Sequence, residues 1–102
     1  MILVFKTEKD ATACEAQIFQ YIQRKYIEDG YKVVDGSIVI KDGKQGIDRW
    51  AYPIKAKTGL LKPSKWYFKS PKSSYPDLYE DMVKGFKFEE IEELPVEWQE
   101  KI

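Results

Sequence analysis

The chain has 102 residues, with 17 basic and 17 acidic side chains, no histidine and a single cysteine, Cys14. This length predicts one domain, spanning residues 1–102, around one core. The lone cysteine excludes a fold held by intramolecular disulfides, and the lack of histidine removes both the usual general base near neutral pH and the commonest zinc ligand.

The first predicted elements are a short strand and a long helix. Residues 1–6 begin with five consecutive apolar side chains, a run too short for a secretory signal or a membrane span, so we expect a cytoplasmic protein with no membrane partner. Thr7 and Asp10 have the spacing of a helix N-cap. From about residue 8 to 29 apolar side chains recur with the helical period, and Gly30 suits the residue that ends a helix.

The next region is rich in valine and isoleucine and predicts an extended chain over residues 31–41. Within it, Asp35-Gly36 is either the turn of a hairpin or a bulge in one longer strand, and the sequence leaves both open. Residues 42–46 predict a second turn, which leads into a strand from residue 47 to about 57.

The last third of the chain predicts a strand over 64–70, a short helix over about 75–84 and a final strand near 86–91. Ser74 and Asp77 repeat the capping spacing before the short helix. The last several residues are expected to fray or to form a turn of helix.

Together these elements predict an α+β fold. A mainly antiparallel sheet of four to five strands is expected to pack on one long N-terminal helix, with a short second helix beside it. Strands and helices do not alternate along the chain, which disfavours a parallel sheet.

The net charge of zero is the sum of three unequal blocks. Residues 1–43 carry a net charge of −1, residues 44–72 carry +7 and residues 73–102 carry −6. The acidic end is expected to fold back over a basic surface, to attract a basic partner, or to remain a solvated tail.

The basic block also holds aromatic side chains, and strand alternation predicts how the two kinds are distributed. Six side chains are expected to face the core: Trp50, Tyr52, Ile54, Ala56, Trp66 and Phe68. The opposite face then carries the candidate binding residues, which are Arg49, Lys55, Lys57, Lys65, Tyr67 and Lys69.

Two functions fit this predicted face. The first hypothesis is a small non-catalytic interaction module whose polarised surface docks onto a protein partner or onto a second copy. The alternative is a nucleic-acid-binding module in which the face around Tyr67 holds a phosphate backbone without sequence specificity. A third interpretation assigns no ligand, because lysines also solvate the outside of a sheet and protect its edge.

The sequence does not favour an enzyme. Cys14 falls on the apolar stripe of the long helix, and a serine triad lacks its histidine. Glu15 and Asp35 match two acidic ligands of restriction-type magnesium nucleases, but the acid-x-lysine triplet of those enzymes is missing. We therefore expect no enzymatic activity, no metal and no cofactor, with metal-dependent carboxylate chemistry as the one exception left open.

Overall fold

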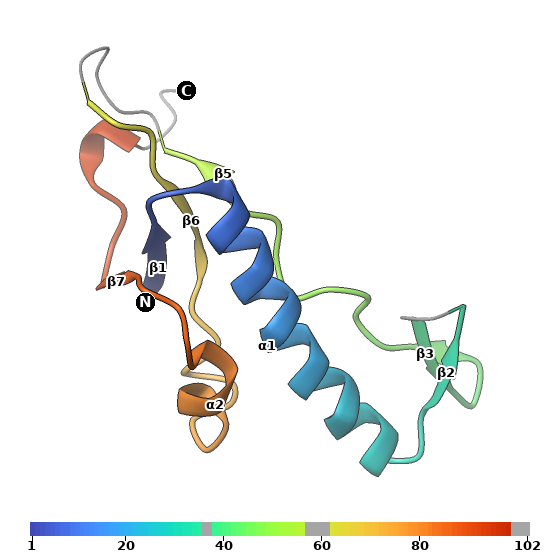
Figure 1. Cartoon of the computed structure of the whole chain (residues 1–102). Coiled ribbons are helices and arrows are strands. Elements are labelled where there is room, and N and C mark those ends of the chain that lie inside the picture. Colours follow the sequence, from blue (N-terminus) through green and yellow to red (C-terminus); the bar gives the residue numbers. More distant parts are fainter. Residues whose placement is uncertain (36–37, 57–61, 99–102) are drawn as a thin grey trace.

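The computed structural model describes residues 1–35, 38–56 and 62–98. Its elements, in chain order, are β1 (Ile2–Phe5), α1 (Glu8–Glu28), β2 (Lys32–Val34), β3 (Ile38–Lys41), β4 (Lys44–Gln45), β5 (Ile54–Lys55), β6 (Trp66–Lys69), α2 (Tyr79–Val83), β7 (Glu89–Ile91) and the 3-10 helix η1 (Val96–Trp98). The predicted α+β class is confirmed, with one long helix, a short second helix and antiparallel pairing (Figure 1).

Helix α1 forms where its caps and its apolar stripe predict it. The Thr7 hydroxyl accepts a hydrogen bond from the Asp10 N–H at 3.1 Å, which satisfies one of the free amides of the first turn. At the other end Gly30 adopts a φ of +99°, and the Lys41 ammonium donates to the Asp29 carbonyl at 2.7 Å. Both ends of the helix are therefore fixed by side chains or by a residue that tolerates left-handed backbone.

The main sheet has the strand order β5-β6-β1-β7, with every pair antiparallel. Its inner face packs against α1 and α2. The Phe5 and Phe68 rings stack there at 5.3 Å between centroids, over the fully buried Ile18 and Ile22 of α1. This inner face is the principal core of the protein.

The outer face of the main sheet, turned away from α1, carries a second and smaller apolar cluster. Val4, Ala56 and Tyr67 are buried there, and Leu94 and Trp98 of the C-terminal segment pack on them. The Tyr67 and Trp98 rings are stacked, with centroids 5.8 Å apart. The C-terminal segment therefore packs on the sheet as far as η1. This short helix agrees with the turn of helix that the sequence predicted as one alternative.

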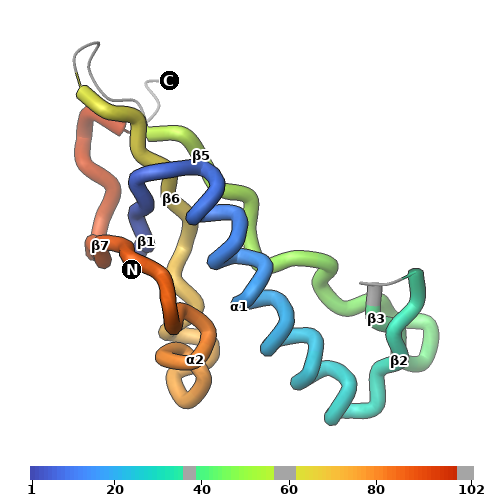
Figure 2. Tube along the Cα trace, viewed as in Figure 1, coloured from blue at the N-terminus to red at the C-terminus, as the bar shows by residue number. Residues whose placement is uncertain are grey.

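The remaining strands form a separate sheet, with the order β2-β3-β4, at the far end of α1 (Figures 1 and 2). Asp42 and Gly43 connect β3 to β4 with φ angles of +52° and +76°, the type I′ geometry that matches strand twist. The turn expected over residues 42–46 is thus shorter than predicted. Val34 pairs with Ile38, so the chain reverses between β2 and β3, which makes the hairpin correct and the bulge wrong.

Several predicted elements are shorter in the structure, among them the final strand, which spans only Glu89–Ile91. Among the described residues of the strand expected over 47–57, only Ile54 and Lys55 are extended and paired. The short helix begins at Tyr79 because the residues before it form turns, in which the Tyr75 N–H bonds to the Pro71 carbonyl. Ser74 does not cap this helix, since Pro76 disfavours helical backbone at the residue that precedes it.

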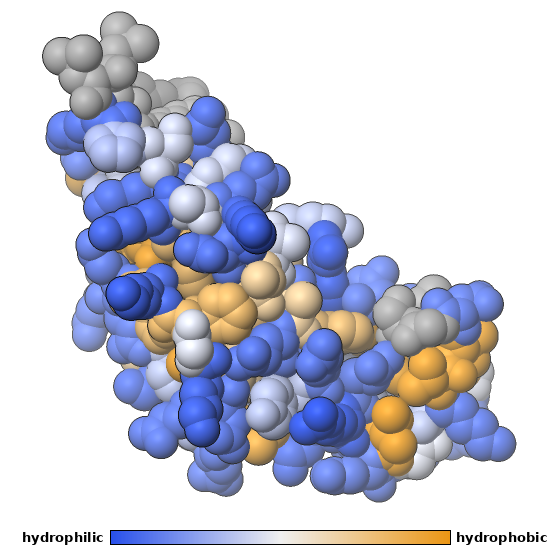
Figure 3. All heavy atoms as spheres, in the orientation of Figure 1, coloured by the Kyte–Doolittle hydropathy of each residue, from blue (hydrophilic) through white to orange (hydrophobic). Residues whose placement is uncertain are grey.

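The molecule is elongated, because the small sheet projects from the end of α1 (Figure 1). Its principal extents are 49 × 31 × 22 Å and its radius of gyration is 15.4 Å, against about 13 Å for a typical compact chain of this length. Val33 and Val34 of the small sheet are exposed apolar side chains. Figure 3 shows an apolar area over β2 and β3.

Gly46 is predicted to control how closely the small sheet approaches α1. A Cβ at this position would lie 2.8 Å from Val39 Cγ2 and 2.9 Å from the Tyr26 ring. We expect Gly46→Ala to reduce the free energy of opening of the β3 amides by about 1–3 kcal/mol, measured by hydrogen exchange. The exposed neighbour Gln45→Ala is the control, and equal effects of the two substitutions would contradict the close approach.

Candidate functional site

The predicted basic face does not form as one surface. Ile54 pairs with Tyr67 and Lys55 pairs with Trp66, and residues opposite each other in a sheet share a face. Lys55 therefore lies on the inner side of the sheet and Ile54 on the outer side, the reverse of the prediction. The predicted alternation requires a regular strand from Ile47, but residues 47–53 do not form one. A shift of one residue in such a strand inverts the face of every later side chain.

The C-terminal segment occupies part of the outer face. The Glu89 carboxylate lies 3.8 Å from the Lys65 ammonium. Tyr67, expected as an exposed ring among lysines, is only 9% exposed and is stacked under Trp98. The acidic end thus folds back on this face, and the Tyr67 ring is not available to stack on a base.

Arg49 and Lys69 each lie over an aromatic ring of the segment that precedes β5. The Arg49 guanidinium carbon lies 4.1 Å from the centroid of the Tyr52 ring, and the Lys69 ammonium lies 4.6 Å from that of Trp50. Such contacts orient the cations without neutralising them. Lys57, the sixth predicted residue, lies outside the described residues.

An apolar groove lies beside these cations. Its volume is about 450 Å³, and we name it the β5 groove; its lining includes Ile2, Ala51, Tyr52, Ile54, Tyr67 and Lys69. Tyr52 is 69% exposed and Ile54 is 52% exposed. Adjacent large apolar side chains left open to solvent are typical of interaction surfaces rather than of an ordinary sheet edge.

A buried carboxylate holds one wall of the β5 groove. Glu15 of α1 is 3% exposed, and its Oε1 accepts hydrogen bonds from the N–H groups of Trp50 at 2.8 Å and Ala51 at 3.5 Å. The Trp50 indole N–H donates to the Lys69 carbonyl at 2.8 Å. These bonds fix residues 50–51 between the helix and β6, so that the next residue, Tyr52, points outward.

The acidic residues considered as metal ligands are not brought together. Glu15 is engaged by backbone N–H groups, whereas Asp35 lies beyond β2, in the small sheet. In the described part of the chain, no group of three or more cysteine, aspartate or glutamate side chains is arranged to hold a metal ion.

Cys14 is fully buried in the core. Burial, together with the charge of the neighbouring Glu15, raises the pKa of the thiol to about 12. A thiol with this pKa is protonated at neutral pH and is not a nucleophile.

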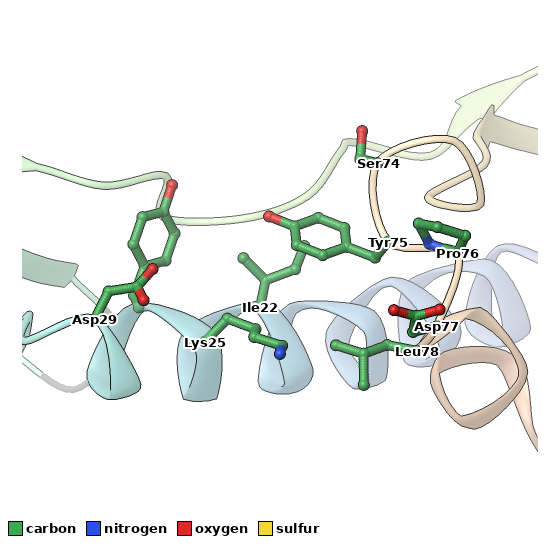
Figure 4. Close-up of a pocket in the computed structure, with 9 residues that line it drawn as sticks. Ile22, Lys25, Asp29, Ser74, Tyr75, Pro76, Asp77 and Leu78 are labelled. Carbon is green, nitrogen blue, oxygen red and sulfur yellow. The ribbon is translucent and has the colours of Figure 1, made fainter.

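A second hollow, of about 350 Å³, lies between α1 and the turn at residues 74–78. Figure 4 shows Tyr75 reaching from that turn along α1 toward Ile22. Burial raises the pKa of the Tyr75 hydroxyl. Lys25 lines this hollow together with the oppositely charged Asp29 and Asp77, so the lining carries a net charge of −1 and has no surplus of cations that would select an anionic ligand.

A third hollow, of about 230 Å³, is lined by Lys65 together with Lys6 and Lys87. Lys6 and Lys87 are not among the binding residues predicted from the sequence. Asp10 and Glu89 line the same hollow. The two carboxylates offset most of the positive charge, so this hollow is a weaker candidate than the β5 groove for an anionic ligand.

No protein-family model, curated protein or solved structure matches this chain. None of the helices in the described ranges combines the length and the apolar character needed to cross a bilayer. The functional argument therefore rests on the geometry of the β5 groove.

Glu15 is predicted to be required for the path of residues 50–51. Glu15→Ala leaves two backbone N–H groups without their acceptor, and we expect a loss of about 2–4 kcal/mol in the free energy of unfolding, measured in urea. Glu15→Gln keeps a carbonyl oxygen and should lose less. Glu28→Ala, at an exposed position of the same helix, is the control; a similar loss there would contradict the role given to Glu15.

Cys14 is predicted to resist alkylation in the folded protein. A thiol of ordinary pKa, about 8.5, is mostly ionised at pH 9.5, whereas Cys14 keeps its proton. We expect iodoacetamide to react at least about 100-fold more slowly than with the chain in urea. Because ionisation favours the unfolded state, stability should fall as the pH rises above about 8.5, and Cys14→Ala should reduce that slope. Equal reaction rates in the two states would contradict the burial.

Proposed function

We propose that this protein is a small non-catalytic interaction module that docks a protein partner in the β5 groove. The observation that carries the proposal is the pair of exposed apolar side chains, Tyr52 and Ile54, beside an apolar hollow. The hydrogen bonds that Glu15 accepts from residues 50–51 fix one wall of that hollow, which reduces the conformational entropy lost on binding.

The nucleic-acid alternative has less support. A phosphate backbone requires a row of cations on one surface. Here Lys55 lies on the inner side of the sheet, Lys65 is paired with Glu89, and Tyr67 is covered. Lys69 lines an apolar groove and Arg49 contacts Tyr52 of the same groove, and this apolar lining would contribute nothing to phosphate binding.

Removing the apolar side chains of the groove is predicted to weaken docking. We expect the double substitution Tyr52→Ser with Ile54→Ser to weaken partner binding at least about tenfold, because each side chain buries its surface in the complex. Partners captured from the cells that produce the protein are identified by mass spectrometry, and the affinity of each purified partner is then measured by calorimetry.

The matched control is Val33→Ser with Val34→Ser, which removes two apolar side chains from the small sheet, where they are 44% and 40% exposed. Loss of binding in this variant alone would move the docking surface to the small sheet. Sedimentation measures whether two copies of the chain associate with each other. A labelled oligonucleotide that binds at low salt, and weakens steeply as salt is added, would instead favour the nucleic-acid alternative.

A further inference from the structure

The outer face of the main sheet already binds one peptide segment, which is the chain's own C-terminus. Leu94 and Trp98 pack on the cluster around Tyr67, and the Trp98 ring stacks on the Tyr67 ring. The segment that carries them, residues 92–98, has the sequence Glu-Glu-Leu-Pro-Val-Glu-Trp, in which carboxylates flank apolar side chains. The sheet face therefore shows by its own structure which kind of segment it accommodates.

The β5 groove is the uncovered continuation of the same face. Ile2 and Tyr67 belong both to the cluster under the C-terminal segment and to the lining of the groove. Toward β7 these side chains are covered by Leu94 and Trp98, whereas toward β5 the groove is open and Ile54 is half exposed. The two halves thus share a floor of aliphatic and aromatic side chains.

Charge at the groove favours an acidic occupant. Arg49 and Lys69 stand beside the groove, and within the described ranges neither has a carboxylate within 4.0 Å. Lys65, on the covered half of the face, has its carboxylate from Glu89. Among the described residues, no carboxylate plays the equivalent part on the open half, and a partner would supply it.

We propose that the β5 groove accepts an acidic peptide segment of a partner protein, with an aromatic or aliphatic anchor in the hollow and carboxylates on Arg49 and Lys69. This inference rests on the proposed function and specifies the chemistry of its partner. The occupant resembles residues 92–98 of the chain itself in composition, and it lies beside that segment rather than replacing it.

The segment binds through side chains and does not extend the sheet. β5 is two residues long, and Pro53, which precedes it, has no N–H to donate to an added strand. The Ala56 N–H is already bonded to the Lys65 carbonyl at 2.7 Å. The edge therefore offers too few free backbone groups for strand addition, and affinity depends on the anchor and the carboxylates.

The probe for this inference is a fluorescein-labelled peptide with the sequence of residues 91–98. A second probe, the control peptide, has all three glutamates replaced by glutamine. We expect the glutamate probe to bind about tenfold more tightly than the glutamine probe. Backbone amide signals of Ile2, Ile54 and Lys69 should shift on binding. The glutamate probe should also weaken as salt is added, because its carboxylates meet exposed cations.

Charge reversal locates the contact. Arg49→Glu with Lys69→Glu should weaken the glutamate probe by about tenfold and leave the glutamine probe unchanged. The matched control is Lys32→Glu with Lys44→Glu, at exposed lysines of the small sheet, which should leave both probes unchanged. Arg49→Gln with Lys69→Gln, which adds no negative charge, should give a smaller loss, and circular dichroism verifies that each variant is folded.

The outcomes separate this inference from the proposed function. Equal binding of the two probes, or no effect of charge reversal, would overturn the inference that the groove accepts an acidic segment. The proposed docking function would still be supported if the Tyr52 and Ile54 variant lost partner binding. Signal changes confined to Leu94 and Trp98 would show that the probe displaces the chain's own segment, which contradicts a separate site. Displacement of the probe by an oligonucleotide at lower concentration would replace a protein partner with nucleic acid and overturn both proposals.

Discussion

The rest of this structure depends on one buried carboxylate. Glu15 lies in the core side of α1, where a charge without partners would be strongly unfavourable, and the N–H groups of Trp50 and Ala51 satisfy it. Those residues belong to the irregular segment that connects the small sheet to the main one. The bond therefore fixes the path between the two sheets and presents Tyr52 at the groove.

Local signals in the sequence predicted the elements whose causes are local. Thr7 and Gly30 bound α1, and Asp42-Gly43 supplies the positive φ angles of a tight hairpin. The length of β5 could not be predicted in this way, because residues 47–53 have strand-like composition but their backbone groups bond to a helix side chain. The Trp50 and Ala51 N–H groups bond to Glu15 instead of to a neighbouring strand, and Ile54 then pairs with Tyr67 on the outer face.

The candidate site was predicted only in part. Arg49 and Lys69 lie close to the same groove, and Tyr67 lines it but is buried rather than exposed. Lys55 faces the inner side of the sheet, and Lys65 is paired with Glu89. The sequence contains one further signal of this site. Glu15 has helical spacing with the apolar Ala11, Ile18 and Ile22, which places a carboxylate on the buried stripe of the helix. A charge at such a position requires hydrogen-bond donors from elsewhere in the chain, which is the role that residues 50–51 fill.

The separation of the two sheets gives the molecule two levels of cooperativity. Val39 of the small sheet is fully buried, belongs to neither apolar cluster of the main sheet and packs near Gly46 and Tyr26. Opening of β2, β3 and β4 would leave the stacked Phe5 and Phe68 rings in place. We therefore expect the small sheet to open at a lower free energy than the whole chain, because few of its side chains pack on the main core.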